Sequence, residues 1–105
     1  MRKAEVFVQN QPAGFLIEND EGTPSKYVFE YLESYDGTPV SLNYPTKQKR
    51  YEFDSFPSFF DGLLPEGPQL EALLKQAKLD RRDYFGQLVT VGADLVGAVT
   101  VKESR

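Results

Sequence analysis

Alternating apolar and polar residues predict β-strands in the first third of the chain. Residues 4–9 and 15–18 alternate with a period of two, and the turn-forming residues 10–14 lie between them, which predicts a hairpin. The clearest alternation is in residues 26–32, where the aromatic residues Tyr27, Phe29 and Tyr31 would share one face. We therefore expect three antiparallel strands before residue 33.

Further strands are predicted on either side of a helical region. The Asp36-Gly37 pair is a turn signal, and the alternation in residues 40–44 after it indicates another strand. A short strand is also predicted at 50–53. The last segment, Leu95 to Lys102, returns to β character with Gly97 inside it, and glycine within a strand favours a bulge or a close backbone approach.

A helical period begins after Pro57. Residues 58–64 are short and apolar, which suits one or two helical turns. Pro68 stands where the next helix would begin, because the missing N–H of proline costs little in a first helical turn. An apolar stripe with helical spacing follows it, formed by Leu70, Leu73, Leu74 and Ala77. Glu71 and Lys75 have the spacing of a helical ion pair.

A further helix is expected after Asp80, which has the chemistry of an N-cap, with Asp83 in the first turn. Its apolar face would be Tyr84, Phe85, Leu88 and Val89, and Gly92 can end it. The order of strands, then helices, then a final strand predicts one α+β domain over residues 1–105. We expect an antiparallel sheet of about five to six strands with two to three helices packed on one side.

The composition restricts the chemistry that the chain can perform. It contains no cysteine and no histidine, which excludes thiol nucleophiles, imidazole bases and the commonest metal ligand. No glycine-rich phosphate loop and no kinase catalytic loop occurs in the sequence. We expect no enzyme, no catalytic residue, no cofactor and no metal site. The rival hypothesis is a small hydrolase that uses Asp61 and Glu66 as paired carboxylates, although two acids around a glycine and a proline are common by chance.

The charge argues against a nucleic-acid partner. The formal net charge is −4 and the pI is near 4.8, so the chain as a whole repels a phosphate backbone. The basic run at 47–50 could touch phosphate, but a solvated hairpin end explains it better. The acidic turn at 19–21 lacks the spaced ligands of a calcium loop. No apolar stretch is long enough for a bilayer span and no signal peptide is present, so we expect a cytoplasmic protein that contacts neither nucleic acid nor membrane.

Residues 56–67 stand out because large apolar side chains are interrupted by turn-forming residues. Such a segment either caps a core or forms a contact patch. Both roles hold together if Phe56, Phe60 and Leu63 face inward while Phe59 or Leu64 reaches a partner.

The stretch from Phe59 to Gly67, FFDGLLPEG, resembles the FFxGLLPEG signature of the N-terminal subdomain of HipA-type Ser/Thr kinase toxins. The stretch from Gly92 to Val99, GADLVGAV, is similar to the Gly-x-Asp-x-x-Gly-Ala-Val stretch of the same family. The hairpin around residues 6–16 also resembles the opening of that subdomain. The resemblance covers essentially the whole chain, and the order and spacing of the two motifs make it specific.

This resemblance implies a binding protein without kinase activity. In the family, the subdomain precedes a kinase core that supplies the ATP loop, the catalytic Asp and the metal-binding Asp, and none of these motifs occurs here. A free-standing chain resembles the HipS-like antitoxin of bacterial three-part toxin–antitoxin systems. Its implied partner is a HipA-like kinase toxin that lacks its N-terminal subdomain; a HipB-like DNA-binding protein would join the complex, without direct contact expected. The expected partner-binding residues are Phe59, Phe60, Asp61, Leu63, Leu64, Pro65 and Glu66.

An alternative role is equally compatible with these motifs. The chain can be a structural N-terminal subdomain cut from an intact HipA-like toxin, non-catalytic by itself. The charged end at residues 102–105 favours a natural terminus. A kinase reading frame directly continuous with the chain would favour the alternative.

Overall fold

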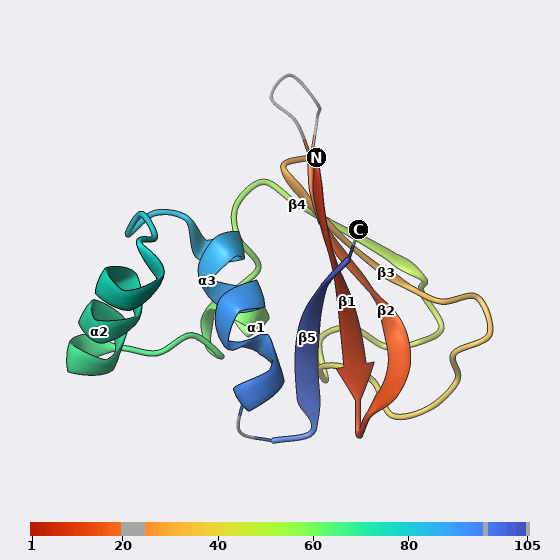
Figure 1. The fold of residues 1–105 in the computed structure, drawn as a ribbon. Coiled ribbons are helices and arrows are strands. Elements are labelled where there is room, and N and C mark those ends of the chain that lie inside the picture. Colours follow the sequence, from red (N-terminus) through yellow and green to blue (C-terminus); the bar gives the residue numbers. More distant parts are fainter. Residues whose placement is uncertain (20–24, 96, 105) are drawn as a thin grey trace.

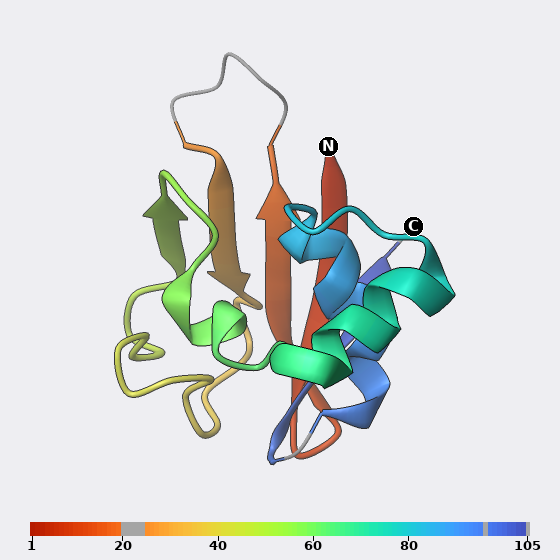
Figure 2. The same ribbon diagram turned by 90° about the vertical axis from the view of Figure 1, so that its left-hand side faces the viewer.

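The computed structural model describes residues 1–19, 25–95 and 97–104, which form a five-stranded sheet with helices on one face (Figures 1 and 2). The strands are β1 (Arg2–Val8), β2 (Gln11–Glu18), β3 (Tyr27–Tyr31), β4 (Arg50–Phe53) and β5 (Val99–Ser104). They lie in the order β4-β3-β2-β1-β5, and all neighbouring pairs are antiparallel. The helices are α1 (Ser58–Asp61), α2 (Gly67–Ala77) and α3 (Tyr84–Val91), followed by a 3₁₀ turn, η1 (Gly92–Asp94). The predicted α+β fold is confirmed.

The core lies between the sheet and the helices. The face predicted for the third strand is right, because Tyr27, Phe29 and Tyr31 are buried there. The ring centroid of Phe29 lies 5.8 Å from that of Phe60 in α1, so the first helix packs directly against β3. The remaining core side chains on the strands are Ala4, Val6, Val8, Ala13, Leu16, Val99 and Val101.

The turn of the first hairpin is shorter than predicted. It consists of Gln9 and Asn10, with φ angles of 50° and 66°, and residues 11–14 belong to β2. Two left-handed residues give a turn whose twist matches that of the flanking strands. Gly14 therefore serves the sheet and not the turn: a Cβ there would lie 2.1 Å from the carbonyl oxygen of Glu30 in β3.

The strand predicted at residues 40–44 is wrong. This segment is an irregular loop, and the buried hydroxyl of Tyr31 holds it in place. That hydroxyl donates a hydrogen bond to the carbonyl of Tyr44 at 2.5 Å and accepts one from the N–H of Val40 at 2.9 Å. A buried tyrosine hydroxyl needs such partners, and they take two backbone groups that a strand ladder would otherwise use.

The prediction of the third helix was right about its existence and wrong about its start. Asp83, not Asp80, is the N-cap, and its carboxylate accepts a hydrogen bond from the N–H of Gly86 at 3.0 Å. The carboxylate of Asp80 instead accepts from the N–H of Arg82 within the preceding turn. Both aspartates satisfy the local requirements of a cap, so sequence chemistry alone does not choose between them.

Helix α3 ends as predicted, with Gly92 at its C-cap, but the start of β5 differs from the prediction. The α-helix ends at Val91, but Gly92 continues into η1, and β5 begins at Val99 rather than Leu95. A Cβ on Gly92 would lie 2.0 Å from the carbonyl oxygen of Val101, so this glycine lets the helical layer meet the edge strand closely. Gly97, with φ at 113°, precedes the strand and is not inside it. Val96 lies outside the described residues.

Helix α2 confirms its predicted stripe but contributes no fully buried residue. Figure 1 shows it on the far side of α3 from the sheet, and its four apolar side chains are only half-buried. Glu71 pairs with Arg81 in the following loop, and not with Lys75 as the spacing suggested. Within the described residues, no helix has the length and apolar character that a bilayer crossing requires.

Candidate partner-binding surface

Phe60 anchors residues 59–67, which we call the signature segment, to the core. It is fully buried at 0% exposure, and its ring lies 5.1 Å from that of Phe59 in a T-shaped arrangement. A partner cannot reach a side chain that the fold encloses completely. Phe60 was expected among the partner-binding residues, and in this structure it is a core residue that supports the surface instead.

Phe59 is half-buried rather than presented to solvent. Its ring makes a T-shaped contact with Tyr44, with centroids 6.0 Å apart. Phe56 packs against Tyr27 on the sheet and Tyr84 on α3, at 5.3 and 5.7 Å. The inward orientation predicted for Phe56 is therefore confirmed, and Phe59 joins the same aromatic cluster with part of its ring exposed.

The chain beyond α1 is held by a short series of turn hydrogen bonds. The N–H groups of Gly62, Leu63 and Leu64 donate to the carbonyls three or four residues earlier, at 3.0 to 3.1 Å. Gly67 then takes a φ of 59°, a left-handed value that glycine adopts without strain, and Pro68 occupies the first turn of α2. These hydrogen bonds and the backbone of Gly67 and Pro68 define the course of residues 61–66 between the two helices.

Two hollows flank this connection. The first, of about 380 Å³, opens towards the end of α3; its lining is Gly62, Leu63, Leu64, Pro65, Gln69, Val91, Asp94 and Leu95. The second, of about 260 Å³, opens towards α2 and the start of α3; its lining is Asp61, Leu64, Pro65, Glu66, Leu70, Arg81, Tyr84 and Gln87. Leu64 and Pro65 line both hollows and therefore separate them. We call these two residues the Leu64 ridge.

The structure thus places five of the seven predicted residues in the lining of the two hollows. Phe59 lines neither hollow, and Phe60 lies beneath them. Sequence reasoning missed the lining that other elements supply, notably Leu70, Tyr84, Val91, Asp94 and Leu95. The helical stripe pointed to Leu70 as apolar, but no pattern indicated that the stripe begins beside the signature segment. Tyr84 is 40% exposed, which is high for a tyrosine on a predicted apolar face.

Asp61 and Glu66 line the same hollow with exposed side chains. Glu66 occupies the N-cap position of α2 without a side-chain capping bond. A hydrolytic carboxylate pair needs one carboxyl in an enclosed apolar environment, which neither residue has. The described residues also contain no group of three or more acidic, histidine or cysteine side chains suited to a metal ion. The geometry therefore gives the hydrolase hypothesis no support.

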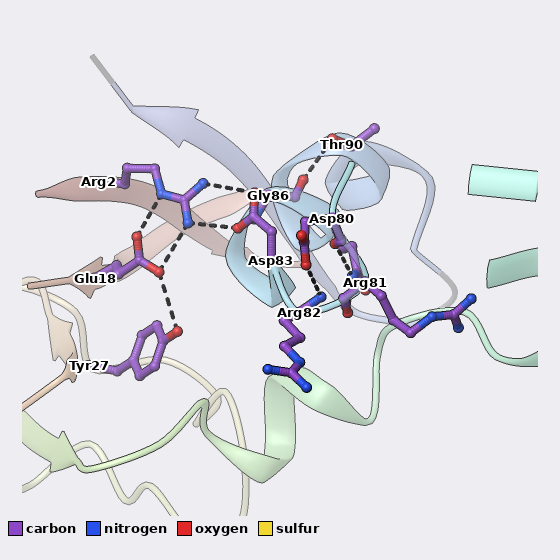
Figure 3. Close-up of polar contacts among 10 residues, drawn as sticks. Arg2, Glu18, Tyr27, Asp80, Arg81, Arg82, Asp83, Gly86 and Thr90 are labelled. Carbon is purple, nitrogen blue, oxygen red and sulfur yellow. Dashed lines mark hydrogen bonds and ion pairs between the residues drawn. The ribbon is translucent and has the colours of Figure 1, made fainter. Parts of the chain in front are cut away.

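An ion-pair network holds α3 against the sheet (Figure 3). The guanidinium of Arg2 in β1 donates to both carboxylate oxygens of Glu18 at 2.7 and 3.0 Å, and to those of Asp83 at 2.7 and 3.3 Å. Its carbon lies 4.9 Å from the centroid of the Phe85 ring. One side chain at the start of the chain therefore fixes the start of the helix that forms a wall of the second hollow.

The network shifts the proton affinities of its members. The hydrogen bonds from Arg2 lower the pKa of Asp83. The hydrogen bonds that Arg2 donates to Glu18 and Asp83 raise the pKa of Arg2. Burial, followed by the charge of Glu18, raises the pKa of Tyr27 to about 12. No sequence pattern links residues that are 81 positions apart, so this network could be found only in the folded chain.

The basic run at 47–50 is largely engaged within the fold. The ammonium group of Lys49 donates to the carbonyl of Tyr35 at 2.8 Å, and Arg50 pairs with Glu30 at 2.6 Å. These contacts agree with the structural interpretation of the run. The acidic turn considered at 19–21 lies outside the described residues beyond Asn19.

The comparisons with known proteins decide the family. Residues 4–102 match the family model of the HipA N-terminal domain. This chain belongs to the HipA N-terminal domain family. A solved structure of the N-terminal domain of HipA toxin superposes on this HipA N-terminal domain with a TM-score of 0.79, at 28% identity, over 100% of this chain and 94% of the other.

A protein of Haemophilus influenzae strain Rd, described as uncharacterized, is 30% identical over 105 residues, which is 100% of this chain and 95% of that protein. The resemblance inferred from the signature segment is therefore confirmed, and the chain is similar in length to both relatives. The Leu64 ridge and its hollows are built largely from the two stretches that carried the resemblance.

Proposed function

We propose that this HipA N-terminal domain is an antitoxin subunit that binds and inhibits a HipA-like Ser/Thr kinase toxin lacking its own N-terminal domain. The observation that carries the proposal is the Leu64 ridge. It is a preformed, partly apolar surface between two hollows, formed by the signature segment and supported by the buried Phe60. Rigid, preformed surfaces lose little conformational entropy on binding.

Inhibition of this kind needs no chemistry from the chain. Phosphoryl transfer requires positioned phosphates, metal ions and a base, and a protein that occupies the kinase cleft or holds it closed prevents that arrangement. The sequence itself has none of the kinase motifs. The complex would contain a HipB-like DNA-binding protein that contacts the kinase and not this chain, and it would form in the cytoplasm.

A second candidate function is a structural one. The similar solved structure is the N-terminal domain of HipA toxin, so a domain of this kind also occurs in a toxin. In that role the Leu64 ridge would pack permanently against the kinase core of the same polypeptide. A reading frame that continues into a kinase would favour this role, and a separate kinase frame would favour the antitoxin.

The test uses a HipA-like kinase that lacks its own N-terminal domain, expressed alone and together with this chain. We expect co-purification, rescue of cell growth, and loss of phosphate transfer from ATP when the chain is in excess. Leu64→Ala should weaken inhibition about tenfold or more, as expected for truncating a central contact residue. Leu42→Ala is the matched control, because Leu42 is 96% exposed and lines neither hollow. Full kinase activity at saturating chain would refute the proposal.

A further inference from the structure

The Leu64 ridge is bordered by carboxylates that the fold leaves unpaired. Asp61 and Glu66 line the second hollow, and Asp94 lines the first. All three side chains are exposed, and none forms an ion pair with another residue of the described ranges. The cation in this lining, Arg81, is bound to Glu71. The surface therefore combines apolar hollows with an acidic border.

Gly62, which has no side chain, leaves space for a partner to approach the first hollow closely. Its φ of −65° suits any residue, and a Cβ built there would come no closer than 3.4 Å to the carbonyl oxygen of Phe59. The fold thus does not require glycine at this position, unlike at Gly92 or Gly14. A side chain at 62 would project from the lining of the hollow and reduce its depth.

We infer that the ridge binds a segment of the kinase in which apolar side chains are flanked by lysine or arginine. The apolar side chains would enter the two hollows, and the cations would pair with Asp61, Glu66 and Asp94. This inference rests on the proposed function and specifies the chemistry of the partner's surface. Opposite charges at the margin of an interface steer association and select partners more than they add affinity.

The same charges argue against other occupants. Two copies of this chain meeting through the ridge would place like carboxylates opposite each other, which is unfavourable in a two-fold interface. Nucleic acids and anionic membrane surfaces carry phosphates that this border repels. A basic, partly apolar protein segment is the occupant that both the hollows and the charges favour.

The test measures the association rate constant with the HipA-like kinase between 50 and 500 mM NaCl. The variant Asp61→Asn/Glu66→Gln/Asp94→Asn removes the acidic border. Its control, Glu33→Gln/Asp36→Asn/Glu103→Gln, changes the net charge equally at exposed positions elsewhere. For the wild type and the control, we expect the rate constant to fall about tenfold or more with salt. The border variant should associate about tenfold more slowly at 50 mM NaCl and show a weak salt dependence.

A second variant tests the hollow independently of charge. Gly62→Leu should fold with an unchanged melting temperature and dissociate from the kinase about tenfold faster. Equal association rates for the border variant and the control would overturn the inference while the antitoxin role stands, provided that the wild type inhibits the kinase. Self-association of the chain abolished by Gly62→Leu would also overturn it. Absence of any kinase binding by the wild type would refute both the inference and the proposed function.

Discussion

Asp83 performs two tasks that substitution can separate. Its carboxylate caps α3 through the N–H of Gly86 at 3.0 Å and pairs with Arg2 at 2.7 Å. Asp83→Asn keeps an oxygen that can accept the capping bond but removes the charge that pairs with Arg2. Asp83→Ala removes both interactions. The difference between the two variants therefore isolates the cap.

The magnitudes follow from exposure and geometry. An N-cap contributes about 1 kcal/mol to stability. The side chains of Arg2 and Asp83 are 45% and 27% exposed, so solvent screens their pairing to roughly 0.5–1 kcal/mol. We expect Asp83→Asn to lower the free energy of unfolding by about 0.5–1 kcal/mol and Asp83→Ala by about 1.5–2 kcal/mol. At roughly 4 °C per kcal/mol for a domain of this size, the melting temperature should fall by about 2–4 °C and 6–8 °C.

The assay is urea unfolding at pH 7 and in acid. The pKa of Asp83 is lowered in the folded state by the hydrogen bonds from Arg2, so the stabilisation is present above the unfolded value of about 3.9. It is lost as the pH falls through the folded-state pKa. The difference in the free energy of unfolding between wild type and Asp83→Asn should therefore be at its full value at pH 7 and should disappear in strong acid. Equal destabilisation by both variants, or a gap that widens in acid, would refute this account of the network.

Four further substitutions test the fold around the surface. Gly92→Ala should lower the free energy of unfolding by about 2 kcal/mol, because the new Cβ would meet the backbone of Val101. Gly62→Ala should change it by no more than about 0.5 kcal/mol. Equal effects of the two substitutions in thermal melts would contradict this. Tyr31→Phe removes the partner of two buried backbone groups and should lower the free energy of unfolding by about 2 kcal/mol. Proteolysis within residues 32–49 should become faster. An unchanged urea midpoint would contradict this prediction. Phe60→Ala should cost about 3–5 kcal/mol by urea unfolding, and an effect below 1 kcal/mol would show that Phe60 is not the anchor.

Local patterns predicted most of the fold. The period-two alternation of Tyr27, Phe29 and Tyr31 identified β3 and its buried face, and the stripe beginning at Leu70 identified α2. These features depend on neighbours within a few residues, which the sequence displays directly. The α+β architecture followed from their order along the chain.

The errors arose where distant residues decide the local structure. Residues 40–44 alternate like a strand, but the hydroxyl of Tyr31 binds their backbone from another element. Asp83 is the N-cap in place of Asp80, and the same carboxylate is held by Arg2 from the start of the chain. Neither contact has a signature in the sequence, because each joins residues that meet only after folding.

The candidate surface was predicted only in part, because some of its residues come from elements that are distant in the sequence. The signature segment indicated Leu63, Leu64 and Pro65, which do line the hollows. Their counterparts Val91 and Asp94 come from the end of α3 and η1, and only the tertiary fold brings them opposite the ridge. Phe60 shares the segment but faces the sheet, since a helical turn places adjacent residues on different sides.

The most direct test of the proposed function is a titration of the HipA-like kinase with this chain. Kinase activity is followed as phosphate transfer from ATP while the molar ratio of the chain is raised, with Leu64→Ala and Leu42→Ala in parallel. The account predicts that activity falls to near zero close to a fixed stoichiometric ratio for the wild type and Leu42→Ala, and only at a much higher concentration for Leu64→Ala. Activity that is unchanged at a large excess of the wild-type chain would contradict it.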